Sequence, residues 1–230
     1  MHQQIQLFGA IAVRPAVLAL IPRFETATGL TVAVRREVNP TVKKQIEAGE
    51  AFDLVIINPS MVQDLTATGK VKAGSQVWFG RVGMGVAAKA GSRPLDIRSV
   101  DAFIHALKSA ETIAYASDGT SGGYFSALLD RLGIADEVKP KLVAVPGGQT
   151  ASAVCQAKAE LAVVPVTSIL AAAPEVVLAG RFPAELQSYI DFAIGVSADL
   201  RDAEAARRLS EFLTSTSVDD ILAAKGVERR

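Results

Sequence analysis

The sequence predicts an α/β fold of two lobes, each a mostly parallel sheet flanked by helices. Short apolar runs alternate with segments of helical length before residue 70, and the same alternation returns after residue 99. Two extended segments, near 81–88 and 188–196, separate the two series. Strands that alternate with helices at these lengths are typical of parallel sheets, because a parallel crossover needs a long connection.

The first series contains three strand–helix pairs. Proline favours the first helical turn and glycine the position just past the end, so Pro15 and Gly29 delimit the first helix. Asn39 is the expected N-cap of the second helix, with Pro40 at its first position, and Asn58 introduces the third. The strands are expected at 4–11, 30–36 and 53–57, and the helices at 15–28, 41–49 and 61–69.

The second series has the same rhythm and is followed by an extended run and two closing helices. It follows the segment 81–90; its strands are expected at 112–117, 141–145 and 160–166, and its helices at 99–109, 124–133 and near 149–157. The extended run covers 189–198, and the closing helices cover 203–215 and 217–226. We therefore assign 1–81 and 188–230 to lobe 1 and 82–187 to lobe 2, with crossovers near 81–88 and 188–196.

The composition excludes several classes of function. With 24 Lys and Arg against 24 Asp and Glu, the chain has no basic excess for binding nucleic acid. No stretch reaches the roughly 18 uninterrupted apolar residues that a transmembrane helix needs. Residues 1–10 lack the basic start and apolar core of a secretory leader. The sequence thus predicts a periplasmic protein if a leader was removed, and otherwise a cytoplasmic one.

Cysteine and histidine are too few for the common catalytic and metal sites. Cys155, His2 and His105 are the complete set, which argues against a metal cluster, a Cys–His dyad or a Ser–His dyad. His105 is expected on a helix surface, and Cys155 as a small buried apolar residue. We predict no metal and no cofactor.

The loops that follow the expected strands share an unusual composition. They are rich in glycine, hydroxyl and amide residues and poor in carboxylates: 9–15, 37–41 and 58–60 in lobe 1, and 117–123, 146–150 and 165–168 in lobe 2. In open parallel sheets ligands bind at the carboxyl ends of strands, where helix N-termini expose up to four unpaired N–H groups. Such ends stabilise an anion by about 0.3–1 kcal/mol each when exposed. These loops predict a small-anion site in a cleft between the lobes.

The loop 118–123, Asp-Gly-Thr-Ser-Gly-Gly, is the strongest single signal. Its glycines allow backbone donors to approach an oxyanion, and its hydroxyls add donors. No Gly-Lys-Ser/Thr follows it, so it is not a nucleotide phosphate loop. Asp118 is a weak candidate for a catalytic base, since an aspartate in such a loop is more often a turn former.

Five stretches of the chain resemble the periplasmic molybdate-binding proteins of ABC transporters. They are 7–32, 42–56, 67–71, 114–134 and 207–226, and the run Gln-Ile-Glu-Ala-Gly at 45–49 before an aspartate-headed strand is the most specific. The resemblance implies a type II periplasmic-binding-protein fold that closes by hinge bending on a small oxyanion. It further implies delivery of that oxyanion to an ABC permease.

The family's ligand positions are only partly kept. Ala12 stands where the family has a serine, and Val166 near where it has a tyrosine, which disfavours molybdate. The resemblance places family backbone donors near Ser121 and near Gly148 or Gln149. The expected ligand-binding residues are Ala10, Ile11, Ala12, Arg14, Asn39, Thr41 and Asn58 in lobe 1, and Thr120, Ser121, Gly122, Tyr124, Gly148, Gln149, Thr150 and Thr167 in lobe 2.

Residues 114–134 and 182–195 also resemble a divergent branch of this superfamily that includes aconitate isomerase. That resemblance implies a small polycarboxylate ligand. The planar guanidinium of Arg14 suits a carboxylate, because it can donate to both oxygens at once. The leading prediction is a binding protein for a small anion. The alternative is an isomerase of an unsaturated polycarboxylate, which needs a base close to a substrate carbon.

Overall fold

The computed structural model describes residues 4–229, which form two compact units. Unit 1 consists of the described residues up to Arg81 and from Asp191 onward, and unit 2 is Val82–Ile190. The chain passes from one unit to the other inside two strands, β4 (Val77–Lys89) and β9 (Tyr189–Val196). These strands contain almost all of the two segments that the sequence suggested as crossovers.

The sheet of unit 1 has the strand order β2-β1-β3-β9. Strands β1 (Ile5–Ala10), β2 (Val32–Glu37) and β3 (Leu54–Ile57) are parallel, and β9 runs antiparallel to β3. All four residues of β3 are buried, as expected for a central strand covered on both faces.

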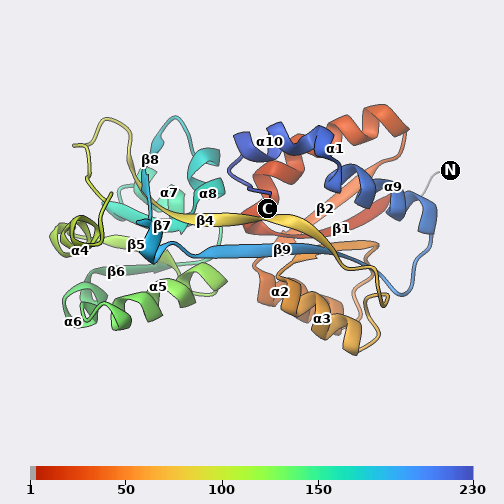
Figure 1. Ribbon diagram of the computed structural model, residues 1–230, viewed down its shortest axis with the longest axis horizontal. Coiled ribbons are helices and arrows are strands. Elements are labelled where there is room, and N and C mark those ends of the chain that lie inside the picture. The colour runs from red at the N-terminus through yellow and green to blue at the C-terminus, as the bar shows by residue number, and fades with distance from the viewer. Residues whose placement is uncertain (1–3, 230) are drawn as a thin grey trace. The chain divides into compact units, whose positions relative to one another are not determined.

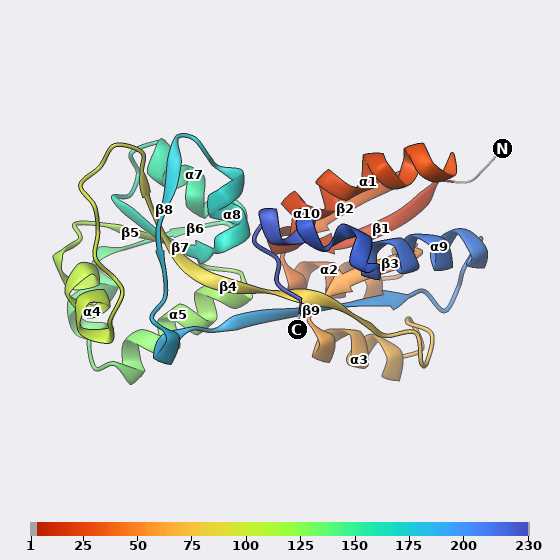
Figure 2. The same ribbon diagram turned by 45° about the horizontal axis from the view of Figure 1, so that its top comes forward.

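Five helices cover the two faces of this sheet: α1 (Arg14–Thr28), α2 (Asn39–Glu47), α3 (Pro59–Ala67), α9 (Ala203–Thr214) and α10 (Asp219–Ala224). Helices α1, α9 and α10 pack together on one face, and α2 and α3 lie on the other (Figures 1 and 2). The rings of Phe24 and Phe212 join α1 to α9 at a centroid distance of 5.5 Å. Gly29 ends α1 in the left-handed region, at φ 70°, as its position predicted.

The sheet of unit 2 combines parallel and antiparallel strands. Strands β5 (Ile113–Ala116), β6 (Leu142–Val145) and β7 (Leu161–Pro165) are parallel, with β5 between the other two. The part of β4 that belongs to unit 2 pairs antiparallel with β7. Strand β8 (Val176–Arg181) also pairs antiparallel with β4. The expected parallel core is therefore present, with antiparallel strands added beside it.

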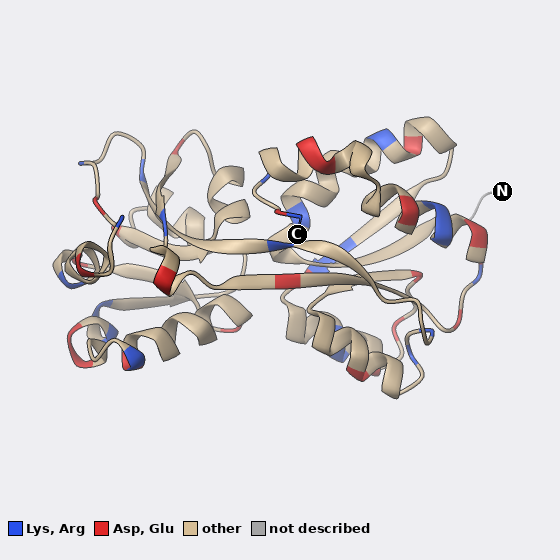
Figure 3. Ribbon diagram, in the orientation of Figure 1, with Lys and Arg blue, Asp and Glu red and all other residues tan. Residues whose placement is uncertain are grey.

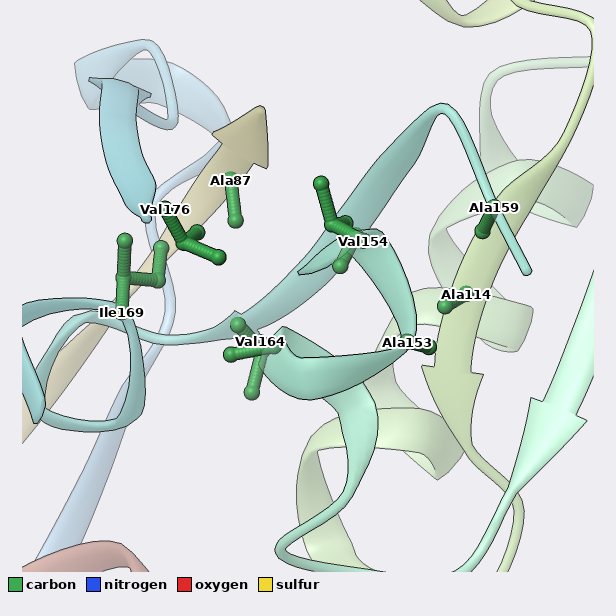
Figure 4. Packing of buried hydrophobic residues seen from close by; sticks show 10 residues of the cluster. Ala87, Ala114, Ala153, Val154, Ala159, Val164, Ile169 and Val176 are labelled. Atoms are coloured by element: carbon green, nitrogen blue, oxygen red, sulfur yellow. The ribbon is translucent and has the colours of Figure 1, made fainter. Parts of the chain in front are cut away.

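The helices of unit 2 also lie on both faces of the sheet: α4 (Val100–Ser109), α5 (Thr120–Arg131), α6 (Ala135–Val138), α7 (Thr150–Cys155) and α8 (Val166–Ala171). Helix α5 packs against β5 and β7 on the face that also carries α4 and α6, whereas α7 and α8 cover the other face (Figure 1). Small side chains such as Ala114 and Ala153 let α7 approach the strands closely (Figure 4).

Sequence prediction missed helix α8 and strand β8. The apolar run 168–180 contains most of both elements, separated by Pro174 and Glu175, and neither has a distinct period of its own. Residues 165–168 were expected to form a loop, but α8 begins at Val166, directly after β7. The short helix α6 was missed as well.

Two single-residue predictions are wrong. Val38, not Asn39, is the N-cap of α2, so Asn39 is the first helical residue and is itself buried. Cys155 is exposed, because it is the last residue of α7 and follows the buried Val154 on the helix. His105 is exposed on α4, as predicted, with its Nε2 3.4 Å from the Ser109 hydroxyl.

Candidate functional site

The carboxyl ends of β1, β2 and β3 meet at one edge of the sheet of unit 1, because these strands are parallel. Helices α1, α2 and α3 begin at this edge within a few residues of each strand end. The predicted residues of lobe 1 all lie here. Ala10, Ala12 and Asn39 are buried, Ile11, Thr41 and Asn58 are half-buried, and Arg14 is exposed.

Proline reduces the number of backbone donors at this edge. Each of the three helices has a proline at its first or second position: Pro15, Pro40 and Pro59. Proline has no N–H group, so each helix end offers one donor fewer than usual. The amide of Asn58 also donates to the Asp191 carbonyl at 2.9 Å, which fixes the start of α3 to β9. An anion bound at this edge would therefore depend on side chains for much of the positive charge that stabilises it.

Arg14 is the first residue of α1 and is the cation of this edge that the sequence identified. Its pKa is lowered, first by burial and second by the positive charge of Arg36. An arginine remains charged at neutral pH in spite of such a shift. The structure thus adds Arg36, which is not among the ligand-binding residues expected from the sequence. The signal that could have identified it is its position at the end of the second strand.

The parallel strands β5, β6 and β7 form the corresponding edge of unit 2, followed by α5, α7 and α8. The loops after β5 and β6 are bonded to each other. The Asp118 carboxylate accepts from the Gly147 N–H at 2.8 Å, and the Ser117 N–H donates to the Val145 carbonyl at 3.1 Å. The Asp118 side chain therefore joins two donor-rich loops.

Helix α5 begins extremely close to the end of β5. A side chain at the buried Gly122 would place its Cβ 1.7 Å from the Ala116 carbonyl oxygen, so only glycine fits. Gly119 is the N-cap of this helix, which has no side-chain cap, and its carbonyl accepts from the Gly122 N–H at 3.2 Å. Ser121 is buried here and Thr120 is exposed.

The remaining predicted residues of unit 2 differ in their burial and in their hydrogen-bond partners. The Tyr124 hydroxyl donates to the Leu186 carbonyl at 2.6 Å, so its single proton is not available to an anion while that bond persists. Gly148, at φ 84°, and Gln149 are exposed in the loop before α7, and Thr167 is fully buried at the start of α8.

Thr150 is the clearest unsatisfied donor of unit 2. Its residue is 1% exposed, and its Oγ1 has no hydrogen-bond partner among the described residues. A buried hydroxyl without a partner costs about 1–3 kcal/mol. Proteins keep such groups most readily where a ligand or a water completes the bond.

Charged residues are spread over both units, and the two signs are mixed (Figure 3). Among residues 4–229, no group of three or more His, Cys, Asp or Glu side chains could hold a metal ion. No helix in the described part of the chain is long and apolar enough to cross a membrane.

Two compact α/β units joined through two strands, with donor-rich loops at the carboxyl ends of parallel strands, define the class of two-lobed binding proteins. The chain belongs to the family of bacterial extracellular solute-binding proteins, whose family model matches residues 5–228. The predicted fold class is confirmed by solved structures of this kind.

Three known proteins illustrate the similarity. The periplasmic molybdate-binding protein of Azotobacter vinelandii has a TM-score of 0.84 at 18% identity, covering 99% of this chain and 100% of that one. The sulfate-binding protein of Mycobacterium tuberculosis has a TM-score of 0.75 at 20% identity, covering 98% and 86%. An aconitate isomerase from a Pseudomonas species is 28% identical over 213 residues, which are 90% of this chain and 79% of that protein.

Proposed function

We propose that this protein captures a small anion, an oxyanion or a small carboxylate, for uptake through an ABC-type permease. The observation that carries the proposal is the pair of donor-rich sheet edges, one in each unit. Each edge collects helix starts, hydroxyls and amides after three parallel strands. Such an arrangement favours an anion over a cation or an apolar ligand.

Family membership supports this proposal. Its members are extracellular solute-binding proteins, and two of the solved relatives are named for binding molybdate and sulfate. We accordingly place the working location of the protein in the periplasm. Within the predicted site, Arg14, Ser121 and Thr150 are the side chains best suited to donate to the anion.

Molybdate is not the anion that the residues favour. Ala12 and Val166 bring no hydroxyl to the positions where the molybdate-binding family has a serine and a tyrosine. A buried dianion needs donors that match its charge, and each donor that is lost leaves part of that charge unsolvated. A carboxylate paired with arginine meets this requirement better.

A thermal-shift panel of molybdate, tungstate, sulfate, phosphate, acetate, succinate and citrate tests the proposal. A ligand that binds the folded state raises the melting temperature by mass action, by an amount that grows with its concentration relative to Kd. We expect at least one anion to raise it in a saturable way at constant ionic strength. No saturable shift with any anion, confirmed by calorimetry, would reject an anion-binding function.

The second candidate function is isomerisation of an unsaturated polycarboxylate, favoured by the 28% identity to an aconitate isomerase. In such a reaction a base removes a proton from the carbon beside the double bond. The double bond shifts, and the proton returns to the far carbon without net oxidation. Asp118 is the candidate base that the sequence suggested. One of its carboxylate oxygens already accepts a hydrogen bond from the Gly147 N–H.

Incubation with cis- or trans-aconitate, followed by ultraviolet absorbance and proton NMR, distinguishes the two functions. Incorporation of solvent deuterium at the migrating position would establish proton transfer. A thermal shift with aconitate but no conversion over hours would support the binding protein instead.

A further inference from the structure

Strand β2 carries two adjacent arginines, and among residues 4–229 a ring contact and an ion pair are formed by the first, Arg35, and not by Arg36. Arg35 pairs in register with Phe8 of β1, and its guanidinium lies 5.0 Å from the centroid of the Phe8 ring. The same guanidinium forms an ion pair with Glu50, in the connection between α2 and β3. Arg35 thus stabilises the face of the sheet that α2 and α3 cover.

Arg36 points to the opposite face, because successive side chains of a strand alternate. That face is covered by α1, which packs against β2 and begins with Arg14 (Figure 1). The two guanidinium groups are close enough for the charge of Arg36 to lower the pKa of Arg14, after burial as the first cause. Neither one has a carboxylate partner among residues 4–229.

A small open space lies beside this pair. Arg36 is in register with Gly9 of β1, and paired residues of parallel strands direct their side chains to the same face. Gly9 is buried, yet a Cβ added to it would find only the Arg35 carbonyl oxygen within 4 Å, at 4.0 Å. The face of β1 next to the two arginines therefore has room for ligand atoms close to the backbone.

From this arrangement we propose that Arg14 and Arg36 together bind a ligand that has at least two carboxylate groups, seated over Gly9. This inference rests on the proposed anion-binding function and specifies its ligand class. Two like charges without a counter-ion repel each other, and a ligand with two carboxylates relieves that repulsion while forming bidentate hydrogen bonds. A tetrahedral oxyanion carries all of its oxygens on one atom. It therefore matches two guanidinium groups less well than a ligand with two separate carboxylates does.

The test is calorimetric titration with tricarballylate, succinate, acetate, sulfate and molybdate at constant ionic strength. Tricarballylate is a saturated tricarboxylate, so it cannot undergo an allylic isomerisation and reports binding alone. The variants are Arg36→Gln, Gly9→Val and the matched control Arg23→Gln. Arg23 is an exposed arginine at the other end of α1, and its loss changes the net charge by the same amount.

We expect the unmodified protein to bind tricarballylate or succinate more tightly than acetate or sulfate. Arg36→Gln should weaken the tricarballylate complex roughly 10- to 100-fold, the range for a hydrogen bond to a charged group. Gly9→Val should weaken it comparably by filling the open space. Arg23→Gln should stay within about twofold, because exposed charges beyond a Debye length are screened. Without ligand, Arg36→Gln should melt at the same or a higher temperature, since a repulsion is removed.

Tricarballylate binding that is unchanged in Arg36→Gln would overturn the proposal, and so would sulfate or molybdate binding tighter than every carboxylate. In both cases the anion-binding function itself would stand. If neither these five anions nor tungstate, phosphate or citrate bound to the folded protein, the proposed function would fail first, and this inference with it.

Discussion

The Asp118 carboxylate and the Gly147 backbone N–H form a hydrogen bond of 2.8 Å that joins the loops after β5 and β6. These are the two loops of unit 2 that lead into α5 and α7. A carboxylate beside a helix start also interacts favourably with the helix dipole. This hydrogen bond gives Asp118 a structural role in unit 2.

Substitution of Asp118 separates this structural role from catalysis. In Asp118→Asn the amide oxygen can still accept from Gly147, and the negative charge that would repel an anion is removed. We expect anion affinity in calorimetry to stay equal or to rise slightly, whereas Asp118→Ala should weaken it by loosening both loops. If the protein converts aconitate and Asp118→Asn binds aconitate but no longer converts it, the residue is a base and our structural explanation is incomplete.

The two glycines at the start of α5 should respond to alanine in opposite ways. Gly122→Ala places its Cβ 1.7 Å from the Ala116 carbonyl oxygen, so α5 must shift, and we expect the free energy of unfolding to fall. Overpacking of this kind costs about 1–3 kcal/mol. Gly123 is exposed with nothing near its Cβ position, so Gly123→Ala should gain about 0.5–1 kcal/mol from helix propensity. Urea unfolding measures both, and equal effects would contradict the close approach.

We expect Arg229 to contribute more to stability than any other side chain near the end of the chain. Its guanidinium donates to the Asp219 carboxylate at 3.0 Å, to the Leu213 carbonyl at 2.8 Å and to the Phe79 carbonyl. Arg229→Ala leaves these partly buried acceptors without donors, which should lower the free energy of unfolding by about 1–3 kcal/mol. Arg208→Ala, on an exposed face of α9, should change it by less than about 0.5 kcal/mol.

Arg14→Ala should weaken a carboxylate ligand by about 1.5–3 kcal/mol, as expected for a hydrogen bond to a charged group. Arg23→Ala is the matched control on the same helix and should leave the affinity unchanged. Calorimetric titration with succinate measures both. Equal losses in the two variants would mean that net charge, and not a contact with Arg14, determines affinity.

Much of the fold could be predicted from local signals. Pro15 and Gly29 delimit α1 to within one residue, since both act through backbone geometry that depends on few neighbours. The loops after the strands were identified from composition, and strand order then brings them to one edge in each unit. Helix α8 and strand β8 were missed because one apolar run contains most of both, and only the tertiary pairing of β8 with β4 distinguishes them.

The candidate site was less predictable, because its chemistry depends on register. Arg36 is next to Arg35 in the sequence, and only the pairing of β1 with β2 shows that one supports Phe8 and the other does not. Tyr124 was expected to donate to an anion, but a carbonyl far along the chain accepts its proton. Cys155 is exposed because α7 ends there, a boundary that apolar neighbours in the sequence do not reveal.

Thr150→Val should change stability and affinity in opposite directions. Valine has nearly the same shape, and the Thr150 hydroxyl is buried without a partner among the described residues, so its loss removes an unsatisfied polar group. The free energy of unfolding of the unliganded protein should rise by up to about 1–3 kcal/mol. If the hydroxyl donates to the bound anion, affinity should fall by a similar amount, because the ligand then loses a donor.

Urea unfolding and calorimetric titration of the same preparation measure the two quantities. A variant that gains stability and keeps full affinity would place the hydroxyl outside the site. A variant that loses stability would indicate that an ordered water satisfies the hydroxyl in the unliganded protein.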